Sequence, residues 1–513
     1  MTLLFITAFC VFAFFRFKVL MLFFQQEEYQ GKWFLTYAFE KGRLIDKKCA
    51  GGILLLWGLS FVYPPIIWGI LPLLAGVAFY QQRVLTGAKR KLAMTQRVKR
   101  ILWVSMGLAF LSASALLPVS LGIGGVILLE LFPLLLVLGN ILLTPVESSI
   151  QQKFLKEAEE NLAKCHPTVI GITGSYGKTS TKHILGHILS QVSPTLWTPG
   201  SVNTKMGICR VIREKLTPQH KYFIVEMGAY FKGSIDRLCQ FVNPSEGIIT
   251  AVGQAHYEHF TSQEIIAKTK FELGEWVTKN KGNLVIGTNQ IAPKFIPKNM
   301  PVIRVGDKEK IHVSGTKQTE KGLEFTFHID GRKTVVHVPI FGLHHVGNIA
   351  LAMTLAVKLG IPLATVVAAL KTLPQINHRL EVSRQGAITI IDDAYNSNVD
   401  GFISALQLLK TLKKNRGILI TPGMIELGKV HEESHRRVGE EAGRLADIVI
   451  VVIPDRIPSF IEGFKKTAKK GQQLLTVSSF AEARSWMQQH VQPGDAVLWE
   501  NDLLDLYETK FTL

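Results

Sequence analysis

Cysteine and acidic residues are both scarce in this chain. The five cysteines are scattered, and none forms a C-x-x-C pair or a Cys/His spacing that would bind zinc. We therefore expect reduced thiols and no zinc centre. The 40 acidic residues are outnumbered by 58 basic ones, and the formal net charge of +18 suggests an anionic partner, either nucleic acid or anionic lipid.

The distribution of the basic residues favours lipid. Residues 82–100 lie between two apolar runs and contain no acidic residue; their basic residues are Arg83, Lys89, Arg90, Lys91, Arg97, Lys99 and Arg100. Such a segment is typical of a cytoplasmic loop of a membrane protein. We therefore predict membrane lipids, and no nucleic acid, as partners, and we interpret the other basic residues as solvated surface.

Long apolar runs are nearly absent after residue 145, whereas residues 1–145 contain four of them, namely 2–24, 50–81, 101–119 and 122–144. Because about 20 helical residues cross a bilayer, we predict a multi-span α-helical domain in the cell membrane. The N-terminus lacks the basic start and the small-residue cleavage site of a signal peptide. We therefore expect the apolar runs to remain in the mature protein.

The second apolar run is long for one span and short for two. Tyr63-Pro64-Pro65 interrupts it, and because proline disrupts a helix we expect a tight hairpin there and five spans in all. The basic content of 25–49 and 82–100 then places the N-terminus outside and everything after residue 145 in the cytoplasm.

The last apolar run also contains polar residues, Glu130 and Asn140, on either side of Pro133. A carboxylate inside a span is costly and is by default a functional candidate. The alternative is that Glu130 pairs with a polar group of a neighbouring helix.

A strand, a glycine-rich loop and a helix follow one another after residue 165. Residues 168–172 predict a buried strand, and apolar residues at helical spacing predict a helix over 178–190. This is the context of a phosphate-binding loop, although Ile172 stands where the general G-x-x-x-x-G-K-[ST] pattern has glycine. We predict that ATP binds here through Gly174, Ser175, Gly177, Lys178, Thr179 and Ser180. Lys178 would reach the β- and γ-phosphates, and Thr179 would hold Mg²⁺.

The stretch Thr173-Gly174-Ser175-Tyr176-Gly177-Lys178-Thr179 resembles the T-G-[ST]-x-G-K-[TS] loop of the Mur ligase family. Further segments resemble that family in the same order along the chain: 223–229, 249–256, 268–272, 344–350, 377–381, 391–398 and 424–428. Residues 391–398, together with 424–428, are similar to those of its dipeptide-adding branch, MurF. The resemblance covers residues 165–500 or thereabouts.

The resemblance implies an ATP-dependent amide ligase of cell-wall or cell-envelope polymer synthesis, in which a carboxylate is activated as an acyl phosphate and then attacked by an amine. It implies that Glu226 and His256 bind Mg²⁺ and that Lys270 is carbamylated. The nucleotide contacts would come from Asn348 at adenine, Arg379 near the phosphates and Asp393 at the ribose. The catalytic residues would be Lys178, Lys270, His256 and Arg379.

The chemistry of the residues agrees with this reaction. A phosphoryl group in transfer spreads negative charge over its oxygens, so the site needs fixed cations such as Lys178, Arg379 and Mg²⁺. An imidazole is unusual for Mg²⁺, which prefers oxygen. Simpler interpretations stay open for several residues: Lys270 as a solvated helix lysine, His344 as a residue that orients a helix start, and Glu432 and His435 as surface.

We predict four parts in the chain: a membrane domain (1–145), a linker (146–165), a central ATP-binding domain (166–373) and a C-terminal domain (374–513). Short strands at 387–391, 417–421, 448–452 and 496–499 alternate with helices and predict a small Rossmann-like, doubly wound sheet in the last part.

Two departures from the family concern the substrate. Membrane helices take the place of the usual uridine-nucleotide-binding domain, and Trp499-Glu500-Asn501-Asp502 stands where MurF has a basic K-G-S-R segment. We therefore expect a carboxylate acceptor that is lipid-linked or part of an envelope polymer, with an amino acid or short peptide as the amine.

Two other functions remain as alternatives. The chain could be a nucleotide-dependent membrane transporter or regulatory protein that uses the loop only for binding, or a scaffold without activity. The sequence has no L-S-G-G-Q-like element and no apolar strand ending in Asp-Glu after the loop, which argues against a transporter.

Overall fold

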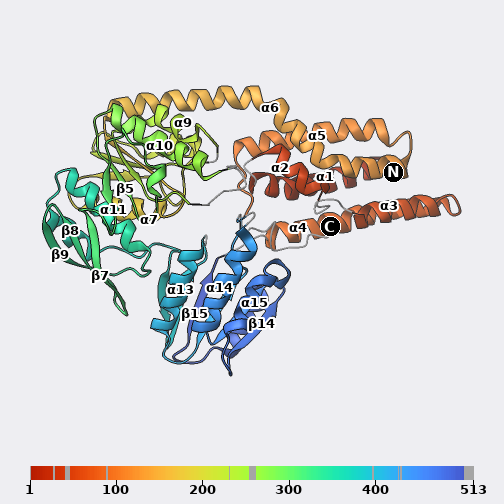
Figure 1. Ribbon diagram of the computed structural model, residues 1–513. Helices are drawn as coiled ribbons and strands as arrows, with labels where there is room; N and C mark the ends of the chain where they lie inside the picture. The colour runs from red at the N-terminus through yellow and green to blue at the C-terminus, as the bar shows by residue number, and fades with distance from the viewer. Residues whose placement is uncertain are drawn as a thin grey trace. The chain divides into compact units, whose positions relative to one another are not determined.

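The computed structural model divides the chain into two compact units, with the division after Gln152. It describes residues 2–26, 29–40, 47–87, 91–229, 231–253, 262–395, 398–425, 427 and 430–501. Figure 1 shows helices throughout the first unit and alternating strands and helices in the second.

The first unit consists of helices. They are α1 Thr2–Gln26, α2 Gly31–Leu35, α3 Lys47–Leu59, α4 Ile70–Gly87, α5 Gln96–Leu116 and the first part of α6, Leu121–Cys165, with a π-helical turn at Thr36–Glu40 and a 3₁₀ turn at Pro64–Gly69. Aromatic side chains join distant parts of the sequence. The rings of Phe12 and Phe17 in α1 lie 5.7 and 4.7 Å from the ring of Phe132 in α6, measured between centroids.

Four segments of the described residues are long and apolar enough to cross a membrane: Ile6–Gln26, Pro64–Arg83, Gln96–Leu116 and Leu121–Cys165. The break predicted at Tyr63-Pro64-Pro65 is present, because α3 ends at Leu59 and a 3₁₀ turn begins at Pro64. Helix α3 does not support the fifth predicted span. Its 13 residues extend only about 20 Å, whereas the apolar core of a bilayer is about 30 Å thick.

Asn140 of the last apolar helix is paired with a neighbouring helix. Its Oδ1 accepts a hydrogen bond from Nη2 of Arg97 in α5 at 3.1 Å. The Arg97 guanidinium also lies 4.0 Å from the centre of the Tyr29 ring. Between the same two helices, Arg100 of α5 donates to Glu147 of α6 at 2.6 Å. These contacts between α5 and α6 give Asn140 a structural role; Glu130 is partly buried.

Residues 146–165, which we predict to be a linker, are helical and form the last part of α6. Pro145 lies inside this helix, which continues to Cys165. The end of α6 packs against α8, Lys205–Lys215, and Asn161 donates a side-chain hydrogen bond to the carbonyl oxygen of Ile212 at 2.8 Å. The amphipathic pattern of this segment therefore reflects a helix with one face on a domain.

A six-stranded parallel sheet in the order β2-β3-β1-β4-β5-β6 forms the centre of the second unit. Its strands are β1 Thr168–Thr173, β2 Thr195–Trp197, β3 Tyr222–Glu226, β4 Glu246–Ile249, β5 Leu284–Gly287 and β6 Ile303–Val305. Alternate residues of β1 enter opposite cores: Ile170 and Ile172 enter one, and Val169 the other. A strand buried on both faces is apolar throughout, which explains the continuous run that marked it in the sequence.

Helices cover both faces of this sheet. One core contains residues of α7 Lys178–Ser190, α11 His345–Lys358 and α12 Leu363–Leu370, and the other contains residues of α8, α9 Ser234–Val242 and α10 Gln263–Lys279. A three-stranded antiparallel sheet adds to the first core; it consists of β7 His312–Thr319, β8 Gly322–Ile329 and β9 Arg332–Val338. Alternate residues of β8, including Phe325 and Phe327, are buried there.

A second six-stranded sheet, in the order β10-β11-β15-β12-β13-β14, forms the C-terminal part. Its strands are β10 Glu381–Gln385, β11 Ile388–Asp393, β12 Gly417–Thr421, β13 Ile448–Val452, β14 Gln473–Val477 and β15 Ala496–Glu500, and its helices are α13 Val399–Leu412, α14 His431–Leu445, α15 Pro458–Thr467 and α16 Phe480–His490. The four strands predicted here are present. The sequence analysis missed β14 and the antiparallel edge strand β10, which are mostly polar or half-exposed.

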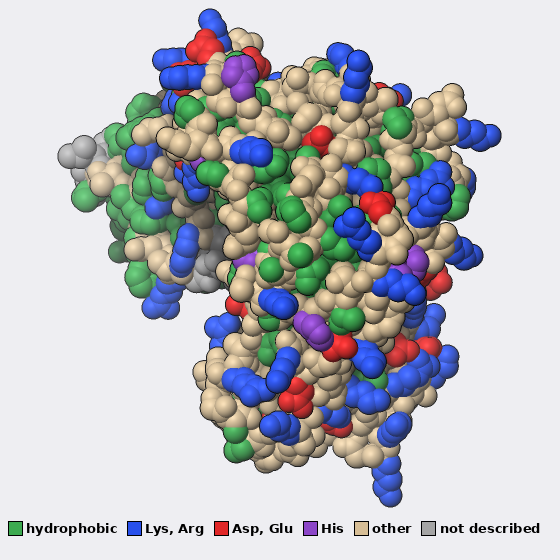
Figure 2. Space-filling view, turned by 90° about the vertical axis from the view of Figure 1, so that its left-hand side faces the viewer, with side chains coloured by type: hydrophobic (Ala, Val, Ile, Leu, Met, Phe, Trp, Pro, Cys, Tyr) green, Lys and Arg blue, Asp and Glu red, His purple; other side chains and the backbone are tan. Residues whose placement is uncertain are grey.

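Figure 2 shows lysine and arginine side chains spread over the visible face with acidic side chains among them. They do not gather into a single patch on that face. This distribution fits the interpretation of most basic residues as solvated surface.

Candidate active site

The glycine-rich loop joins the end of β1 to the start of α7, as the sequence predicted. Gly177 has φ +78°, and a Cβ atom there would lie 2.3 Å from Oδ1 of Asn348. A Cβ atom at Gly174 would lie 1.9 Å from Oγ1 of Thr250. Neither position has room for a side chain, so both glycines are required by the path of the loop.

The loop is fastened to the residues that follow β4. The Ser175 amide donates to the carbonyl oxygen of Ala251 at 2.9 Å, and the Gly253 amide donates to Oγ of Ser175 at 2.9 Å. The first helical bond of α7 runs from the Thr181 amide to Gly177. The amides of residues 178–180 therefore precede the helical ladder, where a phosphate can accept their hydrogen bonds.

Lys178 lies across this loop. Its Nζ donates to the carbonyl oxygens of Gly174 at 2.7 Å and Ser175 at 3.4 Å. Burial lowers the pKa of Lys178, and the positive charges of Arg379 and Lys182 lower it further, while Glu226 opposes the shift. The cations of the site thus lie close enough to influence one another, and an anion among them would relieve their repulsion.

Glu226 ends β3, and its backbone pairs with Ile172 in β1 next to the loop. The buried carboxylate accepts a hydrogen bond from Oγ1 of Thr179 at 2.9 Å and forms an ion pair with Nζ of Lys182 at 2.8 Å, both at Oε2. The structure thus brings together Thr179 and Glu226, the two described residues that we predicted to hold Mg²⁺. Their oxygens are donors of the hard type that this ion prefers.

Sequence reasoning missed Lys182. It lies one helical turn after Lys178, on a face of α7 whose neighbours Thr181, Ile184 and Leu185 are buried. The sequence signal that could have found it is a lysine within the apolar stripe of a helix. An unpaired buried ammonium is too costly to persist, so a lysine at such a position needs a partner.

Lys270 is buried in α10, so its interpretation as a solvated surface lysine is wrong. Burial lowers its pKa well below the usual value, and the charge of Lys178 adds to the effect. Glu272, two residues further on, instead accepts the backbone amides of Gly233 and Asp236 at the start of α9, at 2.8 and 2.9 Å. Glu272 is therefore engaged at the start of α9, whereas Lys270 can take part in the nucleotide site.

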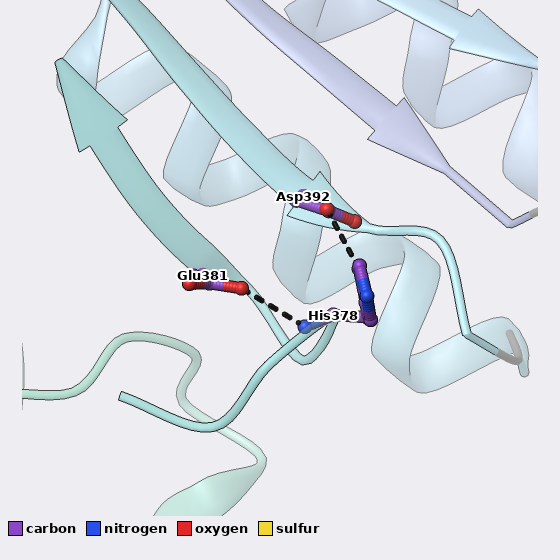
Figure 3. Close-up of side chains that lie close together, drawn as sticks. All are labelled: His378, Glu381 and Asp392. Carbon is purple, nitrogen blue, oxygen red and sulfur yellow. Dashed lines mark hydrogen bonds and ion pairs between the residues drawn. The ribbon is translucent and has the colours of Figure 1, made fainter. Parts of the chain in front are cut away.

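The turn that carries Arg379 is held by three side chains (Figure 3). His378 Nδ1 lies 2.8 Å from a carboxylate oxygen of Asp392, and the His378 amide donates to Glu381 at 3.2 Å. The ligand-type atoms of these three side chains all lie within 4.8 Å of one another. Their mutual contacts stabilise a turn in which His378 and Leu380 both have left-handed φ values, of 56° and 51°.

Arg379 itself stacks on Tyr395, with the guanidinium carbon 4.3 Å from the ring centre. Asp393 accepts the backbone amide of Leu380 at 3.2 Å, on the other side of the turn. Burial raises the pKa of Asp393 to about 7, although the positive charge of Arg379 opposes that shift. Arg379 and Asp393 are thus fixed by one turn, and Arg379 lies within electrostatic reach of Lys178.

The remaining predicted residues have different outcomes. Asn348 lies against Gly177 of the loop. His344 precedes α11 and makes no side-chain capping bond, which does not support a role in orienting that helix. His256 lies outside the described residues, as do Glu426 and Gly428 of the 424–428 segment. The segment 249–256, which resembles the family, begins at Ile249, where β4 ends.

His435 is not a surface residue, contrary to our interpretation. It is buried and its Nε2 accepts the backbone amide of Met424 at 2.8 Å. Its Nδ1 lies 2.8 Å from the carbonyl oxygen of His431. The charge-rich sequence of α14 concealed one inward position; Glu432 on the same helix is exposed, as expected.

Comparison with known proteins places this site in a family. Residues 172–356 match the Mur ligase middle domain, and residues 378–500 match the Mur ligase glutamate ligase domain. The UDP-N-acetylmuramoyl-tripeptide–D-alanyl-D-alanine ligase of Mycobacterium tuberculosis is 32% identical over 358 residues, which are 64% of this chain and 69% of the relative. That of Bacillus subtilis is 27% identical over 375 residues, or 70% and 78% of the two chains.

Solved structures of MurF are also similar to this chain. MurF from Acinetobacter baumannii has a TM-score of 0.60 at 25% identity, covering 71% of this chain and 78% of that one. MurF from Thermotoga maritima in complex with ADP shares the fold, with a TM-score of 0.60 at 23% identity and coverage of 70% and 82%. The chain therefore belongs to the Mur ligase family and is an ATP-dependent, ADP-forming ligase.

Proposed function

We propose that this ligase joins the amine of an amino acid or short peptide to a carboxylate of a cell-wall precursor, in the manner of MurF, from a position at the cell membrane. The observation that carries the reaction is the convergence of Lys178, Thr179 and Glu226 beside the carboxyl ends of β1 and β3; the buried Lys270 of α10 lies within electrostatic reach of Lys178. The similarity to the dipeptide-adding ligases supports a short peptide as the amine.

In the proposed reaction, a carboxylate oxygen attacks the γ-phosphorus of ATP and the bond to the ADP oxygen breaks. The amine then attacks the carbonyl carbon of the acyl phosphate. Phosphate leaves with the electrons of the C–O bond, and the nitrogen loses a proton. Lys178 and the amides at the start of α7 hold the phosphates, and Arg379 offsets charge that develops during transfer.

Thr179 and Glu226 fit a Mg²⁺ ion, because a hydroxyl and a carboxylate oxygen meet beside the phosphate-binding loop at 2.9 Å. When bound, the ion would supply positive charge to the phosphate oxygens. We further propose His256 as a ligand, Asn348 as an adenine contact and Asp393 as a ribose contact.

Lys270 is suited to carbamylation. Carbamate formation requires a neutral amine, and the lowered pKa of Lys270 increases the neutral fraction at a given pH. The product would carry negative charge on oxygen, where an ammonium would repel a metal ion. A carbamate at this position would also offset the positive charge of Lys178.

We propose that residues 1–145 hold the enzyme in the membrane, with the catalytic part in the cytoplasm, and that the acceptor is lipid-linked. Four apolar helical segments support the location. A single span would suffice for anchoring, so the additional helices need another role. Contact with the lipid part of the acceptor would give them one.

The test uses the full chain purified in detergent. It is incubated with ATP, a short peptide amine, and either a lipid-linked or a soluble UDP-linked muramoyl peptide acceptor. We expect phosphate release only when amine and acceptor are both present, faster with the lipid-linked form, and none from Lys178→Ala. Equal or better turnover of the soluble acceptor by a chain lacking residues 1–145 would refute the membrane part of the proposal. Phosphate release by Lys178→Ala would refute the assignment of the nucleotide site.

A further inference from the structure

Lys182 is the residue at the site that the reaction above leaves without a task. Its side chain is fully buried in α7, one turn beyond Lys178. Its Nζ donates to Oε2 of Glu226 at 2.8 Å and to the carbonyl oxygen of Gly200 at 2.5 Å. The lysine is therefore fixed from two sides, by a strand end and by the loop after β2.

Glu226 has little capacity left for a cation while Lys182 is in place. Its Oε2 already accepts from Thr179 and Lys182, and Asn203 lies 3.4 Å from Oε1. A carboxylate oxygen has two lone pairs, so Oε2 is saturated and Oε1 keeps one position. The charge of the carboxylate is also neutralised by the ion pair.

The surrounding charges also disfavour metal binding in the absence of a nucleotide. Lys178, Lys182 and Arg379 are three cations that influence one another, and Glu226 is a carboxylate that interacts with both lysines. Positive charges this close to the carboxylate disfavour a free divalent cation. Nucleotide phosphates reverse that balance, because ATP brings several negative charges into the loop.

We propose that Lys182 is a positioning residue that neutralises and orients Glu226, so that a divalent metal ion enters this site only together with a nucleotide. The inference rests on the proposed nucleotide and metal site and adds an order of binding to it. Without Lys182, Glu226 would become an uncompensated buried carboxylate, which would attract a metal ion by itself.

The test measures Mn²⁺ binding to the full chain in detergent by electron paramagnetic resonance, with and without a non-hydrolysable ATP analogue. The variants are Lys182→Met, Lys182→Gln as a neutral hydrogen-bond donor should Met not fold, and Lys182→Met/Glu226→Gln. Lys215→Met removes an exposed lysine of α8 and serves as the control for net charge.

Without nucleotide, we expect Lys182→Met and Lys182→Gln to bind Mn²⁺ on the order of tenfold tighter than the unaltered chain or Lys215→Met. The double variant should lose that gain. Mn²⁺ should also raise the melting temperature of the single Lys182 variants only, a response that a purely structural ion pair would not produce.

Equal Mn²⁺ affinity in the unaltered chain and the Lys182 variants would overturn the inference, as would tight Mn²⁺ binding by the unaltered chain without nucleotide. Failure of the ATP analogue to bind the unaltered chain would instead contradict the proposed nucleotide site. The two failures are therefore distinguishable.

Discussion

Replacing Gly177 with alanine should weaken nucleotide binding through two separable effects. The backbone at this position has φ +78°, a conformation that costs an alanine roughly 1–2 kcal/mol. The new Cβ atom would also lie 2.3 Å from Oδ1 of Asn348. Since carbon–oxygen contacts are normally no closer than about 3.3 Å, the loop or Asn348 must move by about 1 Å.

Both effects act on the segment that presents its amides to phosphate. A loss of 1.4 kcal/mol is a factor of ten in affinity, so we expect the Kd for a non-hydrolysable ATP analogue to rise by about 10- to 100-fold. Isothermal titration calorimetry of the full chain would measure it. In Gly177→Ala/Asn348→Ala the overlap is absent, so the double variant should bind more tightly than the two single losses combined would predict.

Gly360→Ala is the matched control. Gly360 also has a left-handed φ, of +87°, but a Cβ atom there meets nothing within 4 Å. It should lower stability by a similar backbone penalty and leave the Kd unchanged. An ATP-analogue Kd for Gly177→Ala within twofold of the unaltered chain would refute the reasoning.

Three further predictions concern other residues. Lys270→Ala should lack ligase activity and be partly restored by a short-chain carboxylic acid that replaces the carbamate; normal activity of the variant would contradict carbamylation. Burial raises the folded-state pKa of Asp393 from the ordinary 3.8 to about 7, so its ionisation opposes folding as pH rises between these values. Asp393→Asn should therefore gain in melting temperature relative to the unaltered chain from pH 4 to pH 8, and a constant difference would contradict the assignment. Reporter fusions at residue 90 and at the C-terminus should both report a cytoplasmic location, and an extracytoplasmic signal from either would contradict the topology.

Several features were accessible from the sequence because they depend on local chemistry. The helix over 178–190 was predicted with the bounds that α7 has, since a glycine loop and apolar residues at helical spacing define both its start and its inward face. Glu226 came from the family resemblance, and its position at the end of an apolar run supported it, because parallel strands collect polar residues at their carboxyl ends. Arg379 and Asp393 came from the family resemblance, which also gave the ligase activity.

Other features were decided only by contacts between distant segments. Lys182 and Glu226 are 44 positions apart, and no local pattern shows that the helix turns this lysine toward that strand end. The inward position of His435 depends on the amide of Met424. Strand β10 is mostly polar and exists because β11 provides a pairing edge.

The helix across residues 146–165 illustrates the same difference. The sequence of this segment is amphipathic and predicted a linker, whereas the structure shows a helix that contains Pro145 and continues to Cys165. Helix α6 continues because its far end finds a partner in α8, where Asn161 binds the carbonyl oxygen of Ile212. Local propensity sets where a helix can begin or end, whereas burial against another part of the chain supplies the free energy that decides whether it does.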